Sequence, residues 1–222
     1  HQRLGEAAGQ ALMEIVTPDD VLGMSWSRSL SGLAAAMTRM PPCPIVQLTG
    51  AVPPPDGRDL LDLVRSVARI GGGPAHVFYA PMIVDDAETA AAIRRQADVA
   101  GAFALVPSVT VTMLAIGAWA PGLSTIYDAL NQPERDEIAR LGVCAEMAGV
   151  FLSEDGLPVQ TALDSRMIVT PGAALANIPC VIALAYGVSK SVAVRAAIRG
   201  GLVHGLVTHT SLARALLSLA SS

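Results

Sequence analysis

Short apolar runs alternate along this chain with segments whose apolar residues recur at helical spacing. Leu4, Ala8, Leu12 and Ile15 share one helical face, and that helix is predicted to end at 17–20, where a proline fixes the exit. Strands are predicted from Val21 onward and over 44–48, 76–80 and 110–116, and helices over 59–70, 86–98 and 133–141. This alternation indicates an α/β fold with a Rossmann-like, mostly parallel sheet and helices on both faces.

The last third of the chain shows the clearest order of elements. In AYGVSKSVAVRAAIRGGLVHGLVTHTSLARALL, a strand, a helix opened by residues 187–190, a second strand and a second helix follow with almost no loop. The first helical segment is long enough for a crossover and both strands are apolar, so a βαβ unit in a parallel sheet is predicted. Ligands of such sheets bind at the strand ends.

One segment departs from the parallel pattern. Residues 146–152 and 159–161 flank the acidic, glycine-containing segment 153–158, which predicts a β-hairpin. Because no flexible linker isolates the hairpin, we expect a small excursion from the main sheet and a single domain over residues 1–222. The prolines at 53–55 predict a stiff loop between a strand and a helix.

Two uncharged stretches, 99–127 and 167–189, exceed the roughly 20 residues that span a bilayer. Pro107 and Pro121 interrupt the first and Pro171 and Pro179 the second, so each is predicted to be a buried strand with loops. No membrane partner is therefore expected. The N-terminal segment carries acids as well as bases, unlike a signal peptide, and we expect a cytoplasmic protein.

Composition and charge limit the possible functions. The chain is 52% hydrophobic and 15% charged, which favours one large core. Its net charge is −4 and its basic residues are scattered, so it lacks the basic face that nucleic-acid binding requires.

The sequence contains three cysteines, Cys43, Cys144 and Cys180, which form no C-x-x-C pair and indicate reduced thiols. No base that could activate a catalytic thiolate is visible near them in the sequence. The histidines have no ligand spacing with the cysteines, and neither a metal nor a cofactor is expected.

At two positions in the sequence, a basic residue lies at the start of a predicted helix, where an anion would be favoured. Lys190 falls in the first turn of its predicted helix, where the macrodipole disfavours a cation by about 0.3–1 kcal/mol unless an anion shares the site. The alternative is that Lys190 points into water and the small penalty is tolerated.

The second place is the turn Ser25-Trp26-Ser27-Arg28-Ser29, which precedes helical spacing at Leu30, Leu33 and Met37. Serine hydroxyls and backbone N–H groups at a strand-to-helix turn form an anion cradle, and Arg28 adds a fork that suits phosphate or carboxylate. The serines could instead be ordinary N-caps, and Trp26 could be a packing residue.

Six motifs along the chain together carry a family resemblance: GMSWSRSL, VQLTGAV, YAP near residue 80, LAIGAW, CAEMAGVFLSEDGLPV and the C-terminal block. Over nearly the whole chain they resemble the effector-binding domain of SorC/DeoR-type bacterial sugar-responsive transcription regulators. The C-terminal block, with its glycine, Lys190, alanine-rich helix and GLVHGLVT strand, is the most specific part. The resemblance implies a ribose-5-phosphate-isomerase-like fold without that enzyme's activity. It also implies binding of a sugar or phosphosugar that alters operator affinity.

The resemblance further implies site residues and partners. The turn 25–29 is similar to the family's phosphate or sugar cradle, and Lys190 to its anion-contacting lysine. Glu146 is similar to an acid that accepts hydrogen bonds from sugar hydroxyls, and the strand end at Thr49 and Gly50 belongs to the same site. Because a DNA-binding domain precedes this one in the family, we expect contact with DNA only through that missing N-terminal domain. Homo-oligomers, dimers or tetramers, are also expected.

Three positions depart from the family pattern. Ser27 stands where the cradle commonly has glycine, Thr49 where asparagine is frequent, and His209 where a VTD pattern ends in aspartate. The Ser27 side chain would crowd the close backbone approach that a phosphate needs, which favours a sugar over a phosphosugar as the effector.

Three hypotheses follow. The leading one is a sensor domain that is not an enzyme, with Arg28 and Lys190 holding the anionic end of the effector and Glu146 contacting its hydroxyls. The second is a sugar-phosphate isomerase or deaminase with a carboxylate base, or a Schiff base on Lys190, the only lysine. Its further acid–base candidates are Asp128, Asp164 and His204. The third is a structural oligomerisation module whose cations pair with acids across an interface.

Overall fold

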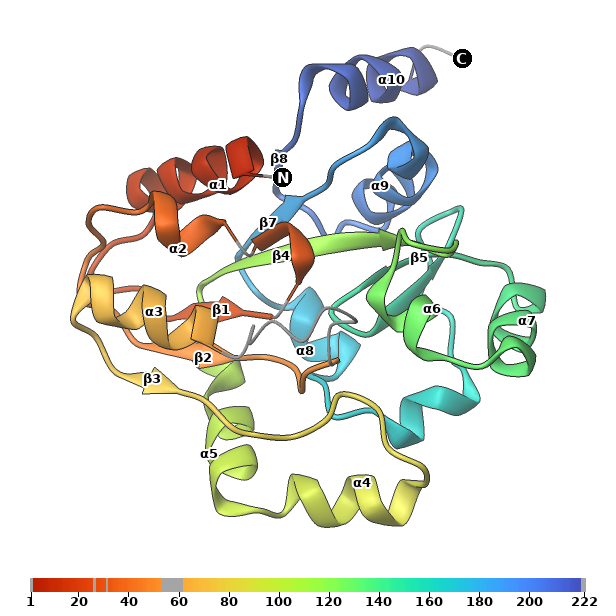
Figure 1. Cartoon of the computed structure of the whole chain (residues 1–222), viewed down its shortest axis with the longest axis horizontal. Coiled ribbons are helices and arrows are strands. Elements are labelled where there is room, and N and C mark those ends of the chain that lie inside the picture. Colours follow the sequence, from red (N-terminus) through yellow and green to blue (C-terminus); the bar gives the residue numbers. More distant parts are fainter. Residues whose placement is uncertain (1, 26, 31, 53–61, 221–222) are drawn as a thin grey trace.

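The structure is a computed structural model that describes residues 2–25, 27–30, 32–52 and 62–220. Within these residues, parallel strands form the main sheet in the order β3 (Ala75–His76), β2 (Ile45–Gln47), β1 (Leu22–Met24), β4 (Val111–Ala118), β7 (Cys180–Leu184) and β8 (Gly205–Val207). The predicted α/β fold with a mostly parallel sheet is confirmed (Figure 1). The C-terminal βαβ unit is also confirmed, because β7 and β8 pair in parallel across a helical crossover.

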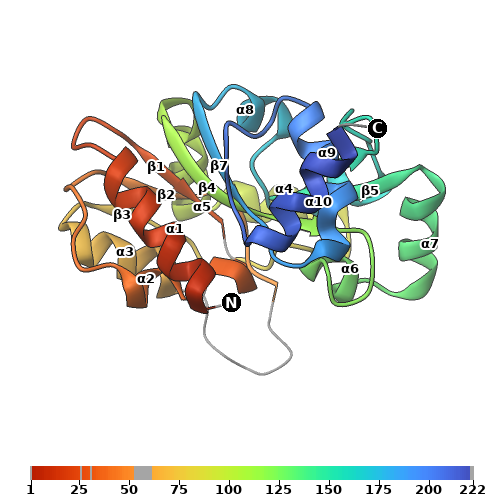
Figure 2. The ribbon, with the colours of Figure 1, turned by 90° about the horizontal axis from the view of Figure 1, so that it is seen from above.

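One face of the sheet is covered by α1 (Gln2–Ile15), α2 (Leu33–Ala36) and α3 (Asp62–Gly71), which lie together in both ribbon views (Figures 1 and 2). Leu12, Leu33 and Val67 from these helices join inward-facing strand residues in one buried cluster. Ile15, predicted on the buried face, is 42% exposed, and Val16 is buried instead because the chain leaves the helix at that point. The prolines at 53–55 and residues 59–61 lie outside the described residues.

The other face is covered by α5 (Ala97–Leu105), α8 (Gly172–Ala176) and α9 (Ser191–Arg199). Neighbouring residues of one strand point to opposite faces. Accordingly, Met113 belongs to the first cluster and Leu114 to the second. The last helix, α10 (Thr210–Ala220), packs on α9 and on the short 3-10 helix η4 (Val188–Lys190). Helices therefore lie on both faces, as predicted.

The predicted antiparallel segment beside the main sheet is confirmed, and it contains two turns. The end of β4 pairs with β5 (Val143–Met147), which pairs with β6 (Val150–Ser153). The two-residue turn between them is Ala148 and Gly149, both with positive φ (50° and 88°), as a type I′ turn requires. The prediction of one strand over 146–152 is therefore wrong. The acidic segment 153–158 forms the second turn, as predicted. The Ser153 N–H donates to the Leu157 carbonyl, and the Val159 N–H beyond the turn donates to the Phe151 carbonyl.

Three further predictions differ from the structure. The helix predicted over 86–98 is two helices, α4 (Ala87–Arg94) and α5, because Gln96 has an extended backbone with ψ 141°. The stretch from residue 99 therefore begins as helix, not as strand with loops. The strand predicted over 76–80 ends at His76, because the Phe78 N–H donates to the Gln47 side chain instead of to a neighbouring strand.

A smaller core lies beneath the antiparallel strands. Phe151 and Leu163 pack there between α6 (Thr125–Ala129), α7 (Gln132–Arg140) and the 3-10 helix η3 (Ala162–Arg166). The remaining short helices are η1 (Arg28–Leu30) and η2 (Val106–Ser108). Among the described helices, none has both the length and the hydropathy to cross a membrane.

Candidate ligand-binding site

The order of the strands marks one edge of the sheet as a place for a ligand. The chain runs from β1 out to β2 and β3, then returns to the other side of β1 with β4 and continues to β7 and β8. The direction of winding thus reverses between β1 and β4. In open α/β sheets, ligands bind outside the carboxyl ends of the strands at such a reversal. A cavity lies there, lined by Ser25 just after β1 and by Ile116 and Gly117 of β4.

Hydroxyl groups form one wall of this cavity. Ser25, Ser27, Ser29 and Thr49 line it, and all four residues are buried. The Ser27 hydroxyl accepts the Leu30 N–H at 3.2 Å, so this serine caps η1, as the N-cap alternative predicted. The turn after β1 therefore presents a short helix and three serines to the cavity.

Lys190 reaches the cavity from the opposite side of the β1–β4 reversal. It is the last residue of η4 and directly precedes α9, and its ammonium donates a hydrogen bond of 2.7 Å to the Ile116 carbonyl. Because Lys190 lines the cavity, the alternative in which it points into open water is wrong. Gly187 has a φ of 100°, which favours glycine at the start of this turn.

Glu146 supplies a buried acid from β5. Its Oε1 accepts the Ser124 hydroxyl at 2.9 Å, and that hydroxyl accepts the Tyr127 N–H, so the N-terminus of α6 orients the carboxylate. Gly117 lies opposite Glu146 in the β4–β5 register. A Cβ at Gly117 would lie 2.2 Å from Glu146 Oε1, so only glycine leaves room for the carboxylate.

Ser124 and Gly117 were missed as site residues. A serine before a helical segment is an N-cap signal, and Gly117 follows an apolar strand, but neither pattern reveals contact with Glu146. That contact depends on the pairing of β4 with β5, which are separated by α6 and α7.

The structure brings six of the predicted site residues to one cavity: Ser25, Ser27, Ser29, Thr49, Glu146 and Lys190. Gly50 is not among the residues that line it. The Gly50 N–H donates to the Ile168 carbonyl, and a Cβ at Gly50 would lie 2.5 Å from the Pro81 oxygen, so this glycine serves close backbone packing. Trp26 and the side chain of Arg28 lie outside the described residues, and the convergence of Arg28 with Lys190 stays a prediction.

The other acid–base candidates have structural partners away from the cavity. Asp128 accepts the Gly122 N–H, Asp164 caps η3 with Thr161, and His204 Nδ1 accepts the Val181 N–H. Of the described residues that line the cavity, Glu146 is the only carboxylate, and none is a histidine.

The cysteines do not contribute to the cavity lining that the structure describes. All three are free, and burial raises the pKa of the Cys43, Cys144 and Cys180 thiols, which keeps them protonated. Within the described ranges, no group of three or more His, Cys, Asp or Glu could hold a metal ion.

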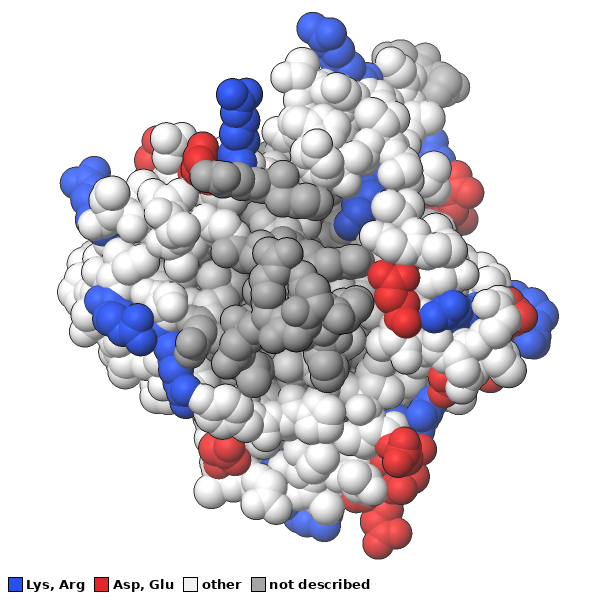
Figure 3. All heavy atoms as spheres, viewed as in Figure 1, with Lys and Arg blue, Asp and Glu red and all other residues white. Residues whose placement is uncertain are grey.

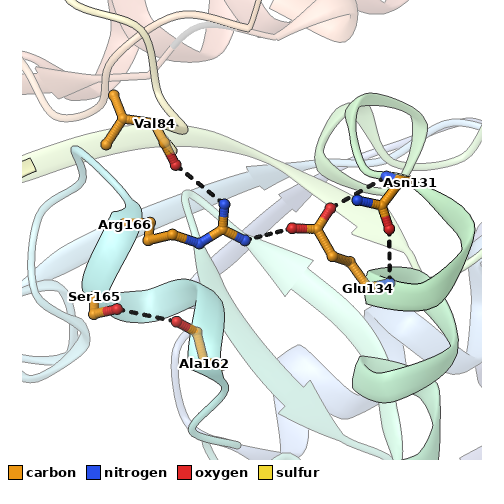
Figure 4. Close-up of polar contacts among 6 residues, drawn as sticks. All are labelled: Val84, Asn131, Glu134, Ala162, Ser165 and Arg166. Atoms are coloured by element: carbon orange, nitrogen blue, oxygen red, sulfur yellow. Dashed lines mark hydrogen bonds and ion pairs between the residues drawn. The ribbon is translucent and has the colours of Figure 1, made fainter. Parts of the chain in front are cut away.

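Two further hollows lie outside this cavity. In one, Arg166 donates to the Val84 carbonyl and pairs with Glu134, which also accepts the Asn131 N–H, so the paired charges satisfy one another (Figure 4). The other is lined mainly by apolar side chains, among them Phe151 and Met167. The cavity at the strand ends is therefore the better candidate for a polar ligand.

A parallel α/β sheet with a cation, an acid and hydroxyls at its point of reversal defines a small-molecule-binding domain. The chain belongs to the family described as "Putative sugar-binding domain", whose model matches residues 1–218. Curated relatives include the transcriptional regulator LsrR of Klebsiella pneumoniae, 31% identical over 99% of this chain and 68% of that protein. The erythritol catabolism regulatory protein EryD of Brucella abortus is 28% identical over 96% of this chain and 69% of its own length.

Solved structures show the same fold. The full-length sorbitol operon regulator SorC from Klebsiella pneumoniae has a TM-score of 0.88 at 19% identity, over 96% of this chain and 71% of that chain. A transcriptional regulator from Streptococcus pneumoniae has a TM-score of 0.87 at 20% identity, over 100% of this chain and 86% of that chain. The resemblance stated from the motifs is confirmed, while the likeness to ribose-5-phosphate isomerase stays a prediction.

Proposed function

We propose that this chain is the effector-sensing domain of a bacterial transcription regulator and that it binds a sugar or phosphosugar at the carboxyl ends of its strands. The observation that carries the proposal is that Lys190, Glu146 and several hydroxyls line a single cavity. Membership of the sugar-binding domain family and the regulator names of the relatives support it.

Each group in the cavity suits one part of such a ligand. The Lys190 ammonium would attract a phosphate or carboxylate, and the serine turn would add donors to the same end, with the predicted help of Arg28. The Glu146 carboxylate would accept hydrogen bonds from sugar hydroxyls. Buried polar groups favour a ligand that can match them with hydrogen bonds of its own.

The signal would reach DNA through another part of the regulator. The chain has a net charge of −4, and its basic and acidic side chains are interspersed over the face in Figure 3. Because of this charge distribution, we propose that the regulator contacts its operator through an N-terminal DNA-binding domain. From the resemblance to SorC/DeoR-type regulators, we also propose a cytoplasmic homo-oligomer. The effector would favour one arrangement of protomers by its differential affinity for two states.

We propose binding without turnover. The described cavity residues offer one carboxylate and one lysine, and the Lys190 ammonium already donates to the Ile116 carbonyl. Isomerisation or deamination needs an acid and a base that both reach the reacting carbon. Borohydride treatment in the presence of an open-chain phosphosugar, followed by mass measurement, tests the Schiff-base variant. A stable adduct on Lys190 would contradict simple ion pairing.

A thermal-shift screen of sugars and phosphosugars tests the proposal. A ligand that binds only the folded state raises the melting temperature, by the equivalent of about 2.7 kcal/mol at 100 times its Kd. If no sugar or phosphosugar in the screen raises the melting temperature, the sensor function loses its main support.

A ligand found in this screen can then be used to test whether the Lys190 ammonium contributes to binding. Lys190→Ala should weaken the binding of an anionic effector by about 1.5–3 kcal/mol, measured by calorimetry. Arg199→Ala is the matched control, because Arg199 is a cation at the far end of α9, where it faces Asp155 at 3.9 Å. Equal Kd values for Lys190→Ala and Arg199→Ala would mean that the ligand binds elsewhere.

A further inference from the structure

His209 links the ends of the last two parallel strands. It follows β8 and directly precedes α10, and its ring lies edge-on to Tyr186 with the centroids 4.7 Å apart. Its Nε2 atom lies 2.9 Å from the backbone nitrogen of Gly187, and its Nδ1 atom lies 3.1 Å from the backbone nitrogen of Leu212. Both neighbours are N–H donors, so the imidazole serves as a hydrogen-bond acceptor.

Gly187 is the first residue of the turn that carries Lys190. The Gly187 carbonyl accepts the Lys190 N–H at 3.0 Å, and this bond closes η4. The Lys190 side chain then reaches the Ile116 carbonyl at the cavity. A hydrogen bond to the Gly187 N–H therefore restrains one end of a turn whose other end is Lys190.

A neutral imidazole has one acceptor nitrogen, so it accepts from Gly187 or from Leu212 but not from both at once. The shorter of the two distances is to Gly187. We propose that His209 is a positioning residue: by accepting the Gly187 N–H it holds η4 and keeps the Lys190 ammonium at the cavity. That this positioning helps to bind the ligand rests on the proposed function. That His209 holds Lys190 in place does not depend on it.

Two substitutions separate the two possible donors to His209, the Gly187 N–H and the Leu212 N–H. The side-chain oxygen of Asn stands about where Nδ1 does, and that of Gln about where Nε2 does. His209→Asn can therefore accept the Leu212 N–H but not the Gly187 N–H. His209→Gln can accept the Gly187 N–H but not the Leu212 N–H.

His204 provides a matched control on the same pair of strands. It directly precedes β8, and its Nδ1 accepts the Val181 N–H at 3.1 Å. His204→Ala thus removes a similar bond from a histidine ring to the backbone of β7, at the end of the strands away from the cavity.

Labelling of the Lys190 amine tests the proposal without any ligand. Lys190 is the only lysine, so the modification rate of the peptide that contains it, measured by mass spectrometry, reports on this side chain alone. We expect His209→Asn and His209→Ala to raise the rate by about two- to tenfold, which corresponds to the loss of one ordinary hydrogen bond. His209→Gln and His204→Ala should label at the wild-type rate.

Two results would overturn the inference: equal rates for His209→Asn and His209→Gln, or a rise in His204→Ala as large as that in His209→Asn. The Asn and Gln variants differ by one methylene group, so a general loss of folding would raise the rate in both. A failed thermal-shift screen would count against the proposed function and would leave these labelling rates unaffected.

Discussion

The substitution Gly117→Ala probes the close packing of the Gly117 backbone against the Glu146 carboxylate in the cavity. The added Cβ would lie 2.2 Å from Glu146 Oε1, 2.9 Å from Glu146 Cδ and 2.9 Å from Ser124 Cβ. An ordinary contact needs about 3.5 Å, so the carboxylate must move by more than about 1 Å. Ser124 cannot give way equally, because its hydroxyl caps α6. The methyl group should therefore displace Glu146 and break its hydrogen bond to Ser124.

Two magnitudes follow from this displacement. Overpacking of a buried site should lower the free energy of unfolding by about 1–3 kcal/mol, which is about 2–12 °C in melting temperature for a domain of this size. If Glu146 contacts the ligand, loss of a hydrogen bond to a charged group should weaken binding by about 1.5–3 kcal/mol, or roughly 10- to 150-fold in Kd.

The assay compares melting temperature and calorimetric Kd for the sugar or phosphosugar that stabilises the wild type most. Gly101→Ala is the control, because Gly101 lies in α5 and its added Cβ would meet nothing within 4 Å. That substitution should stabilise the helix by about 0.5–1 kcal/mol and leave Kd unchanged. A folded Gly117→Ala protein with the wild-type Kd would refute the role of Glu146 in ligand recognition.

Two further predictions concern hydrogen bonds of carboxylates. Ser124→Ala should lose about 0.5–2 kcal/mol in urea unfolding, because it removes both the α6 N-cap and a donor to Glu146, whereas Ser124→Thr should retain most of this stability. Burial acts to raise the pKa of Asp20, but hydrogen bonds from Thr110 and Thr17 outweigh it, so its pKa lies below the ordinary value. The stability from Asp20 is thus present above the unfolded-state pKa of about 3.9 and is lost as pH falls through the lower folded-state pKa. The gap in melting temperature between wild type and Asp20→Asn should therefore narrow below about pH 4, and a constant gap would contradict this account.

The sequence by itself determined the class of fold and indicated several of the residues that line the candidate site. Apolar periodicity is local, so the strands β1, β2, β4 and β7, the helix α7 and the C-terminal crossover were all predictable from short windows. Lys190 could be predicted as a candidate site residue because a lysine at the start of a helix conflicts with the helix dipole. This conflict depends only on the local sequence. The serine turn after β1 was identifiable for a similar, local reason.

Only the tertiary structure decided how these parts meet. The early end of β3 depends on a hydrogen bond from the Phe78 N–H to the Gln47 side chain, which belongs to a distant segment of the sequence. The same is true of the space that Gly117 leaves for Glu146. Such contacts depend on which strands pair and in which register, and the free energy of that choice is spread over the whole core. A window of neighbouring residues therefore contains the elements of this site but not the distances between them.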